Sequence, residues 1–397
     1  MVKYDALIHD RKFFEPAHIK ERQELYKFTQ AVKVETFLWD LELYGQLQRA
    51  LGDQVVLKGG AAAQLFIPTE RQRTSVDIDV IYLGTKDRLE EALTKIHKDF
   101  GEDEVYFKFN KHTPKNPKTI LPLETYFVPI PAAINADSTS NIKVDFHLME
   151  SLGLEVREVE NAAAFVIPLG FNPICLSPAS LLGDKLLTLA QGSVGIPPDR
   201  EDDIVKQLYD LEYLTKNVNS EDTSAMNLAM TTLFEREIAH RSEKVGLDQA
   251  HQDSIRLLER YSTVNSPKPD ELARTATRNF RGNYEPKPFR SSMDWEVTAK
   301  RLQFLVRCIA SNPEQALVNL KEADEIEARI ELKGNERRIE IRQALSEDFV
   351  TLLRGEHRME TAKRLKNTSP ERLLWEVLRP SRLSDIQSLI TPRATSA

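Results

Sequence analysis

The chain has 397 residues, of which 41% are hydrophobic and 29% charged, with a formal net charge of −7. These values are ordinary for a soluble globular protein of two or three domains. No apolar run reaches the roughly 18 residues that span a bilayer, which excludes an integral membrane protein. The charged N-terminus lacks the apolar core of a signal peptide. With only Cys175 and Cys308 present, we expect no disulfide framework and no thiolate metal site. A cytoplasmic protein without a membrane partner is the simplest expectation.

The first part of the chain alternates helical and strand patterns. Residues 15–52 follow the 3.6-residue helical period, with a break expected near Gly45. Val55–Lys58 predicts a short strand, which leads through Gly59-Gly60 into the start of a helix. Further on we expect strands at 76–82, 104–109, 123–130 and 142–148, a charged helix at 87–99, and a polar loop or hairpin at 111–118.

The pattern becomes helical after Ser177. Ser177-Pro178 is expected to cap a helix over 180–189, and a second helix is expected over 199–214. The rest is helical in period apart from 265–290, a basic, proline-rich stretch that predicts a long loop. The last residues, 391–397, are expected to be disordered. We therefore expect an α+β fold with two domains, a sheet-containing one at 1–215 and a helical one at 216–397.

Two aspartates share one face of the strand at 76–82. Side chains alternate along a strand, so Asp77 and Asp79 project together, roughly 7 Å apart at their Cα atoms. Such a pair repels and is costly to desolvate. A divalent cation relieves both penalties, and carboxylate oxygens suit Mg²⁺.

The strand at 142–148 repeats this pattern. Ile142, Val144, Phe146 and Leu148 form its apolar face, which leaves Asp145 on the other face, between Lys143 and His147. If the two strands are neighbours, Asp145 becomes a third carboxylate beside the same metal. We interpret His147 as an ordinary strand-face histidine.

Gly59-Gly60 supplies a possible phosphate contact. Glycines at a strand-to-helix turn let backbone N–H groups approach a phosphate closely. No Gly-Lys-Ser/Thr follows, so this is not a Walker-type loop.

These residues also carry a family resemblance. Lys58-Gly59-Gly60-Ala61, followed by Arg73-Thr74-Ser75-Val76-Asp77-Ile78-Asp79, resembles the Lys-Gly-Gly-Thr and Arg-x-Ser-x-Asp-Ile-Asp signature of the AbiEii-type nucleotidyltransferase toxins. These toxins belong to the DNA polymerase β-like nucleotidyltransferase superfamily. Val144-Asp145-Phe146, the stretch Leu182–Leu187 and the stretch from Arg200 to Leu211 are similar to its later motifs, in the right order. The sequence departs from the family pattern at Ala61, where Thr is usual, and at Gln207, where many members have Asp.

The resemblance implies a mixed-sheet nucleotidyltransferase domain followed by a mainly helical domain. It implies that Asp77, Asp79 and Asp145 hold Mg²⁺, with Mn²⁺ as the alternative ion, against the triphosphate of an NTP. It assigns phosphate contacts to Gly59, Gly60 and Ser75, phosphate steering to Lys58 and Arg73, and catalytic roles to Lys185 and Asp210.

The resemblance further implies nucleotide transfer to a tRNA 3′ end by the toxin of a toxin–antitoxin pair. The basic stretch would then contact RNA through Arg274, Arg278, Arg281, Lys287 and Arg290, with Phe280, Tyr284 and Phe289 interleaved. Three alternatives stay open: a protein or small-molecule acceptor such as an aminoglycoside, a non-catalytic NTP-binding regulator, and a scaffold in which only 216–397 matter.

Overall fold

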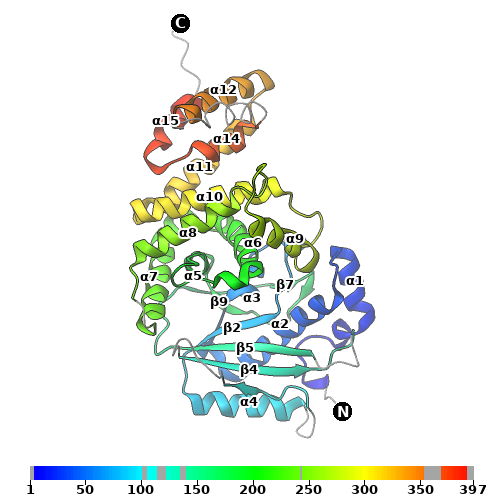
Figure 1. The fold of residues 1–397 in the computed structure, drawn as a ribbon. Helices are drawn as coiled ribbons and strands as arrows, with labels where there is room; N and C mark the ends of the chain where they lie inside the picture. Colours follow the sequence, from blue (N-terminus) through cyan, green and yellow to red (C-terminus); the bar gives the residue numbers. More distant parts are fainter. Residues whose placement is uncertain are drawn as a thin grey trace.

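The protein folds into a sheet-containing body that carries a stack of helices on one side (Figure 1). The computed structural model describes residues 4–100, 105–113, 122–134, 140–241, 244–352 and 368–390. The C-terminal helices lie farthest from the sheet, at the opposite end of the molecule from the N-terminus (Figure 1). The fold is α+β, as the sequence predicts, with a mixed sheet and a helical C-terminal region.

A seven-stranded mixed sheet forms the base of the molecule, with the strand order β3-β4-β5-β2-β1-β9-β6. Its strands are β1 (Val55–Lys58), β2 (Asp77–Tyr82), β3 (Asn110–His112), β4 (Leu123–Ile130), β5 (Ser140–Leu148), β6 (Val156–Glu158) and β9 (Ile174–Leu176). The central pair, β2 and β5, is parallel, whereas β1 runs antiparallel to β2 and β4 antiparallel to β5. A separate hairpin pairs β7 (Ala163–Ala164) with β8 (Ile167–Pro168).

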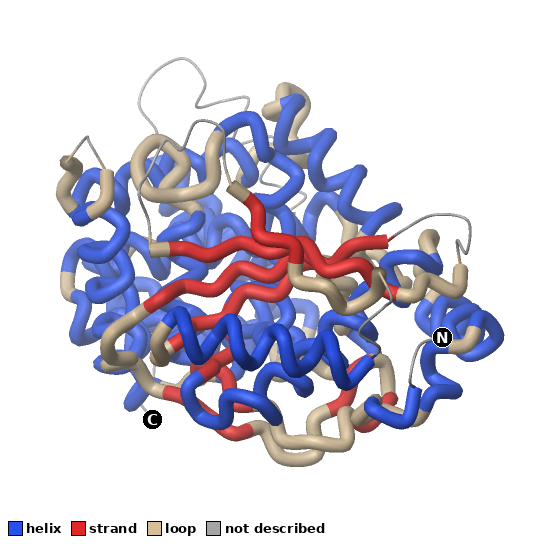
Figure 2. The backbone as a smooth tube through the Cα atoms, turned by 90° about the horizontal axis from the view of Figure 1, so that it is seen from below, coloured by secondary structure: helices blue, strands red, loops and turns tan. Residues whose placement is uncertain are grey.

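Two long helices, α2 (Ala31–Leu51) and α4 (Lys86–Phe100), pack together against the sheet. Figure 2 shows helices crossing the strands on this lower side. Most of α2 is buried, and its buried residues include the polar side chains of Glu35, Asp40, Glu42 and Gln46. It follows α1 (Pro16–Tyr26) and runs through Gly45 without the expected break. A Cβ at Gly45 would come within 2.8 Å of both Ile8 and Phe171, so this glycine serves close packing.

Helices cover the other side of the sheet and build the rest of the molecule. They are α3 (Gly59–Gln64), α5 (Pro178–Thr188), α6 (Glu201–Asn217), α7 (Thr223–Ala239), α8 (Leu247–Tyr261), α9 (Glu271–Asn283), α10 (Ser292–Ser311), α11 (Ala316–Glu331), α12 (Asn335–Leu352), α14 (Pro370–Val377) and α15 (Leu383–Ile390). Ser177 caps α5 as predicted, because its side-chain oxygen accepts a hydrogen bond from the N–H of Ser180. Within the described ranges, no helix is both long and apolar enough to cross a membrane.

Two predicted elements are wrong. Residues 105–109 form turns and no strand, and β3 begins at Asn110. Phe107 takes a positive φ of 59° and buries its ring between Trp39 and Phe100, so core packing overrides the alternating pattern. The stretch at 265–290 contains α9, although it was expected to be a loop. Of the expected loop at 111–118, Lys111 and His112 belong to β3, and 114–118 lie outside the described residues, as do 104 and 391–397.

Candidate active site

A row of polar side chains crosses four neighbouring strands. Asp79 on β2 pairs directly with Asp145 on β5 in the parallel register. Lys58 on β1 faces Asp79 from one side, and Thr125 on β4 faces Asp145 from the other. Because directly opposite residues share a face of the sheet, all four project together, and Asp77, two residues before Asp79, joins them. The two strands that carry the aspartates, β2 and β5, are therefore neighbours in the sheet, as expected.

The Asp145 carboxylate is held by groups of the protein itself. One oxygen accepts a hydrogen bond from the Thr125 hydroxyl at 2.6 Å, and the other forms an ion pair with Lys143. Burial opposes the charge of Lys143, but Asp145, Asp77 and Asp79 outweigh it and raise the pKa of this lysine. An ammonium group thus lies within reach of all three carboxylates.

In this arrangement, no three His, Cys, Asp or Glu side chains among the described residues are placed to hold a metal ion. The donors nevertheless fit one, because they are carboxylate oxygens that a hard divalent cation prefers. The same place already attracts a cation, Lys143. Holding a metal ion requires Lys143 to turn away and the carboxylates of Asp77, Asp79 and Asp145 to converge.

Asp79 and Lys58 lie half-buried in a strongly charged setting. Burial raises the pKa of Asp79 to about 6, and the neighbouring Asp145 and Asp77 act in the same direction, against Lys58. Lys58 forms an ion pair with Asp184 of α5 at 3.0 Å. Burial opposes its charge, but Asp184 and Asp79 outweigh that effect and raise the pKa of Lys58. The Asp184–Lys58–Asp79 chain links helix α5 to the acidic face.

The glycine turn lies against the Asp79 carboxylate. Gly59 has a φ of +71° and Gly60 continues into α3. A Cβ on Gly59 would overlap the Asp79 carboxylate, and one on Gly60 would lie 2.9 Å from Ser75 Oγ and 3.0 Å from an Arg73 guanidinium nitrogen. Both positions need glycine, one for its backbone conformation and both for the close approach.

Arg73 and Asp210 form a buried pair behind this turn. Arg73 donates to both Asp210 oxygens, at 2.8 and 2.6 Å, and neither side chain is more than 2% exposed. Lys185 contacts the same carboxylate at 2.8 Å and donates to Gln207 at 2.8 Å, and Gln64 completes the group by donating to Asp210 at 2.9 Å. Burial alone would raise the pKa of Asp210, but Arg73 and Lys185 hold it below its ordinary value. Arg73 is therefore committed to Asp210, whereas Lys185 also reaches a cavity.

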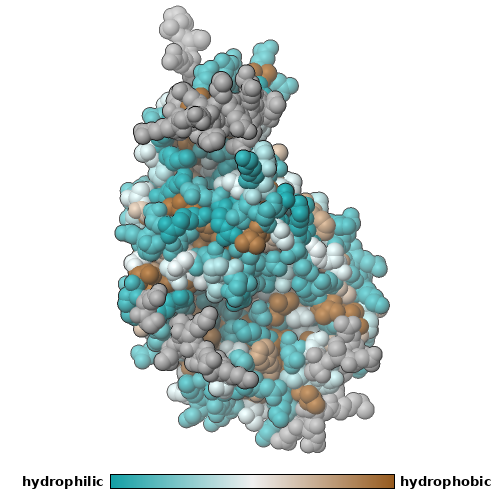
Figure 3. Space-filling model, viewed as in Figure 1, coloured by the Kyte–Doolittle hydropathy of each residue, from teal (hydrophilic) through white to brown (hydrophobic). Residues whose placement is uncertain are grey.

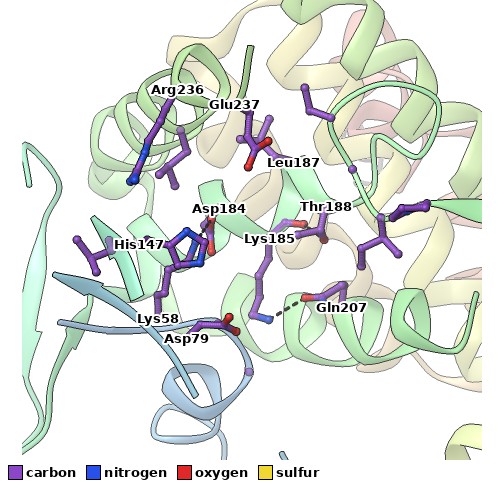
Figure 4. Close-up of a pocket in the computed structure, with 18 of the residues that line it drawn as sticks. Lys58, Asp79, His147, Asp184, Lys185, Leu187, Thr188, Gln207, Arg236 and Glu237 are labelled. Atoms are coloured by element: carbon purple, nitrogen blue, oxygen red, sulfur yellow. Dashed lines mark hydrogen bonds and ion pairs between the residues drawn. The ribbon is translucent and has the colours of Figure 1, made fainter. Parts of the chain in front are cut away.

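That cavity has a volume of about 320 Å³ and opens beside Asp79, between the sheet and helices α5, α6 and α7. Lys58, Asp79 and Lys185 lie on one side of it, and Arg236 and Glu237 line the opposite wall (Figure 4). Its lining also includes Gly59, Gly60, His147, Asp184, Arg200 and Gln207. Burial and the nearby cations lower the pKa of His147 well below its ordinary value, so this histidine is neutral.

A fourth carboxylate lies near the acidic pair. Asp40 on α2 is fully buried, and both of its oxygens have no hydrogen-bond partner among the described residues. Burial, with Asp77 and Asp79 acting in the same direction, raises its pKa well above the ordinary value. Asp40 is therefore held in its neutral form near the site.

Sequence comparison assigns the family. The family described as "Nucleotidyl transferase AbiEii toxin, Type IV TA system" matches residues 43–295, which is more than half of the chain. The chain belongs to the AbiEii family. This makes it a nucleotidyltransferase of a toxin family and confirms the resemblance seen in the sequence. No curated protein matches the chain in a sequence search.

Two solved structures are similar to this AbiEii member in part. One is MenT4, a nucleotidyltransferase toxin from Mycobacterium tuberculosis, at 12% identity and a TM-score of 0.43, over 76% of this chain and 98% of that one. The other is an antigenic nucleotidyltransferase-like protein from Paracoccidioides brasiliensis, at 14% identity and a TM-score of 0.31, over 50% and 88%. At these scores the likeness supports no further conclusion.

The site of this AbiEii member contains residues to which the motifs assigned no role. Thr125 and Lys143 hold Asp145, and Asp184 holds Lys58. The position of Lys143 was predictable from the sequence, since it lies two residues before Asp145 and so shares its face of the strand. Asp184 lies within the Leu182–Leu187 motif, which assigned it no role, and Thr125 carried no sequence signal because strand pairing places it.

Part of the basic stretch around α9 packs against the protein itself, whereas Arg278 and Lys287 are exposed, and its contact with RNA stays a prediction. Phe280 is buried, and the Arg290 guanidinium pairs with Glu212 and lies 4.5 Å from the Trp295 ring centroid. The stretch also braces the loop before β2: the N–H of Thr74 donates to the carbonyl of Tyr284 at 3.3 Å, and Arg71 donates to that of Pro288 at 3.2 Å.

Proposed function

We propose that this protein transfers a nucleotide from an NTP to the 3′ hydroxyl of a tRNA, with Mg²⁺ or Mn²⁺ held by Asp77, Asp79 and Asp145. We further propose that a cognate antitoxin controls this activity. The observation that carries the proposal is the direct pairing of Asp79 with Asp145 in the β2–β5 register, beside the glycine turn.

The residues on the glycine side of Asp79 and Asp145 bind the phosphates in this proposal. In this proposal the phosphates contact Gly59 and Gly60, which line the cavity, and Ser75, whose Oγ lies against Gly60. Lys185 reaches the same cavity as a compact cation and is held there by Asp210 and Gln207. A bound divalent ion supplies charge neutralisation for the triphosphate and the leaving pyrophosphate.

The remaining residues orient and move protons. Asp145 lies farthest from the glycine turn and accepts the proton of the incoming hydroxyl in this proposal. Arg73 and Asp210 are positioning residues, since both are buried and bonded to each other. Neutral His147 forms part of the wall.

The test is incubation of the full chain with a labelled NTP, Mg²⁺ and total RNA. We expect labelled tRNA with the wild-type protein and with Asp53→Asn, which changes an exposed acid outside the site. Asp77→Asn should lower labelling by at least about 100-fold, because one of the proposed metal ligands is lost.

Three results would contradict the proposal. If Asp77→Asn labels tRNA as strongly as the wild type, the acidic site is not the site of transfer. Label on a protein or on a small molecule would assign another acceptor class. Tight NTP binding in calorimetry without any transfer would indicate a regulator and not a transferase acting on tRNA.

A further inference from the structure

An exposed aromatic pair lies on the acidic face of the sheet. Phe127 on β4 is 38% exposed, and the ring of His112 on β3 meets it edge to face, with centroids 5.4 Å apart. His112 is exposed as well. Among the phenylalanines and tryptophans whose side chains are described, Phe127 alone is exposed. We call Phe127 and His112 the aromatic pair.

The strand register places the aromatic pair next to Asp145. Thr125, which donates to Asp145, is directly opposite both Asp145 on β5 and His112 on β3. Phe127 is directly opposite Lys143 and therefore diagonal to Asp145. Diagonal neighbours on an antiparallel pair lie roughly 7–8 Å apart, which is about the reach of one nucleotide.

The aromatic pair and the glycine turn lie on opposite sides of the acidic residues. In the sheet order, β1 and its glycine turn lie beyond β2 on one side, whereas β4 and β3 lie beyond β5 on the other. In phosphoryl-type transfer the attacking and leaving oxygens are roughly in line. With pyrophosphate leaving on the glycine side, the attacking hydroxyl must come from the side of β4.

The chemistry of this surface suits the end of a polynucleotide strand. Aromatic side chains stack on bases of any sequence because every base has a π-face. The side chain of Lys143 is 40% exposed and lies directly across from Phe127, where it can meet a backbone phosphate once it leaves Asp145. A serine or threonine acceptor on a protein has no planar group to use such a surface.

We propose that the base of the acceptor's 3′-terminal nucleotide stacks on Phe127, with His112 bracing the ring and Lys143 contacting the adjoining phosphate. This inference rests on the proposed function, because it takes the acceptor to be a polynucleotide with a free 3′ hydroxyl. It assigns the acceptor to β3, β4 and β5 and not to the α9 stretch.

The test uses the full chain and a short single-stranded RNA with 2-aminopurine at its 3′ end, in Mg²⁺ without NTP. Stacking quenches this fluorophore, so a wild-type complex should show quenching. Phe127→Ala should abolish the quenching and weaken RNA binding roughly tenfold. Phe127→Trp should keep both. Val156→Ala, at an exposed apolar position on the opposite edge strand β6, is the matched control and should match the wild type.

NTP binding by calorimetry should be unchanged in all variants, since the glycine side is untouched, and it also checks folding. If Phe127→Ala fails that check, His112→Ala, at an exposed position, gives the same readout with a smaller loss. Undiminished quenching in the correctly folded alanine variants would overturn the proposal. Equal quenching of a DNA strand of the same sequence would still support stacking and would assign it to single strands in general.

The outcome is separable from that of the proposed function. Quenching without labelled RNA in the transfer assay would retain the stacking site and reject the transfer. Labelled tRNA with no effect of Phe127→Ala on either quenching or RNA affinity would retain the transfer and reject the stacking site.

Discussion

If the site holds the proposed metal ion, Asp79 should make that binding depend on pH. Its pKa of about 6 means that this ligand carries a proton below that pH, and a metal ion must displace the proton. We expect the affinity for Mg²⁺ or Mn²⁺ to fall by roughly tenfold for each pH unit below about 6 and to level off above 7. Calorimetric titration with Mn²⁺ at several pH values measures this directly.

The proton released on metal binding gives an independent check. At pH 6, titrations in buffers of different ionisation enthalpy should report uptake of about half a proton by the buffer, because half of the Asp79 carboxyls are protonated there, and Asp79→Asn should remove it. A metal affinity that stays constant from pH 5 to pH 8 would show that Asp79 is not a ligand.

Asp40 gives a prediction about stability. Its folded-state pKa is raised well above the ordinary value of 3.8. A carboxyl group whose pKa is raised by folding destabilises the fold most at pH values above its folded-state pKa. This penalty disappears as the pH falls to the pKa of the unfolded state. Asp40→Asn should therefore gain stability relative to the wild type as the pH rises from 5 to 9, which thermal unfolding would show as a Tm difference that grows with pH. An equal difference at every pH would contradict the assignment.

Some of the residue-scale arrangement was predictable. Alternation along 76–82 and 142–148 placed Asp77, Asp79 and Asp145 on polar faces, because a strand leaves two choices for each side chain. That Asp79 is opposite Asp145 was not predictable, since pairing between strands more than 60 residues apart depends on the whole sheet. The ion pair between Lys143 and Asp145 also required the structure.

At the scale of elements, helices α3, α5 and α6 are joined through one buried carboxylate. Gln64 of α3, Lys185 of α5 and Arg73 before β2 all bond to Asp210 of α6. Removing one partner of a buried ion pair leaves uncompensated charge and costs about 3–5 kcal/mol. We expect Asp210→Ala to lower the free energy of unfolding by that amount, measured by urea denaturation.

Asp202→Asn, an exposed position on the same helix, is the control and should change stability by less than about 0.5 kcal/mol. A fully stable Asp210→Ala protein that has lost transfer would instead give Asp210 a direct role with substrate.

The two wrong element predictions have different causes. In α9, Ala273, Ala276, Thr277 and Phe280 are buried at helical spacing and Asp270 caps the helix, so the signal was present but the prolines around it predicted a loop. At 105–109 the alternation of Val105, Phe107 and Phe109 did favour a strand. Only the aromatic packing of Phe107 against Trp39 and Phe100 explains why none forms.

At the scale of the whole molecule, helices from both sides of residue 215 pack together. Helix α5 packs on α7, and α6 packs on α9. A Cβ on Gly183 of α5 would lie 2.9 Å from the backbone nitrogen of Met230 in α7, so these two helices touch at their backbones. The domain boundary between 1–215 and 216–397 stays a prediction. Because helices on both sides of it pack together, truncation of the chain at this boundary should destabilise the remaining part.

A fragment that ends at residue 215 would expose the apolar faces of α5 and α6. We expect it to bind the dye ANS and to lose cooperative thermal unfolding, whereas the full chain should unfold in a sharp transition. Cooperative unfolding of the fragment at a similar Tm would establish 1–215 as an independent domain. In the full chain these apolar faces are covered, and the visible surface over the central helices is mostly hydrophilic (Figure 3).

The hydrogen bond from Thr74 to Tyr284 has a consequence for how the protein is made. The loop that carries Ser75 toward Asp77 is braced by a segment translated about 210 residues later, together with the contact of Arg71 with Pro288. A ribosome that has finished the entire sheet has therefore not yet supplied this support. We expect nascent chains to lack nucleotidyltransferase activity until that late segment has emerged.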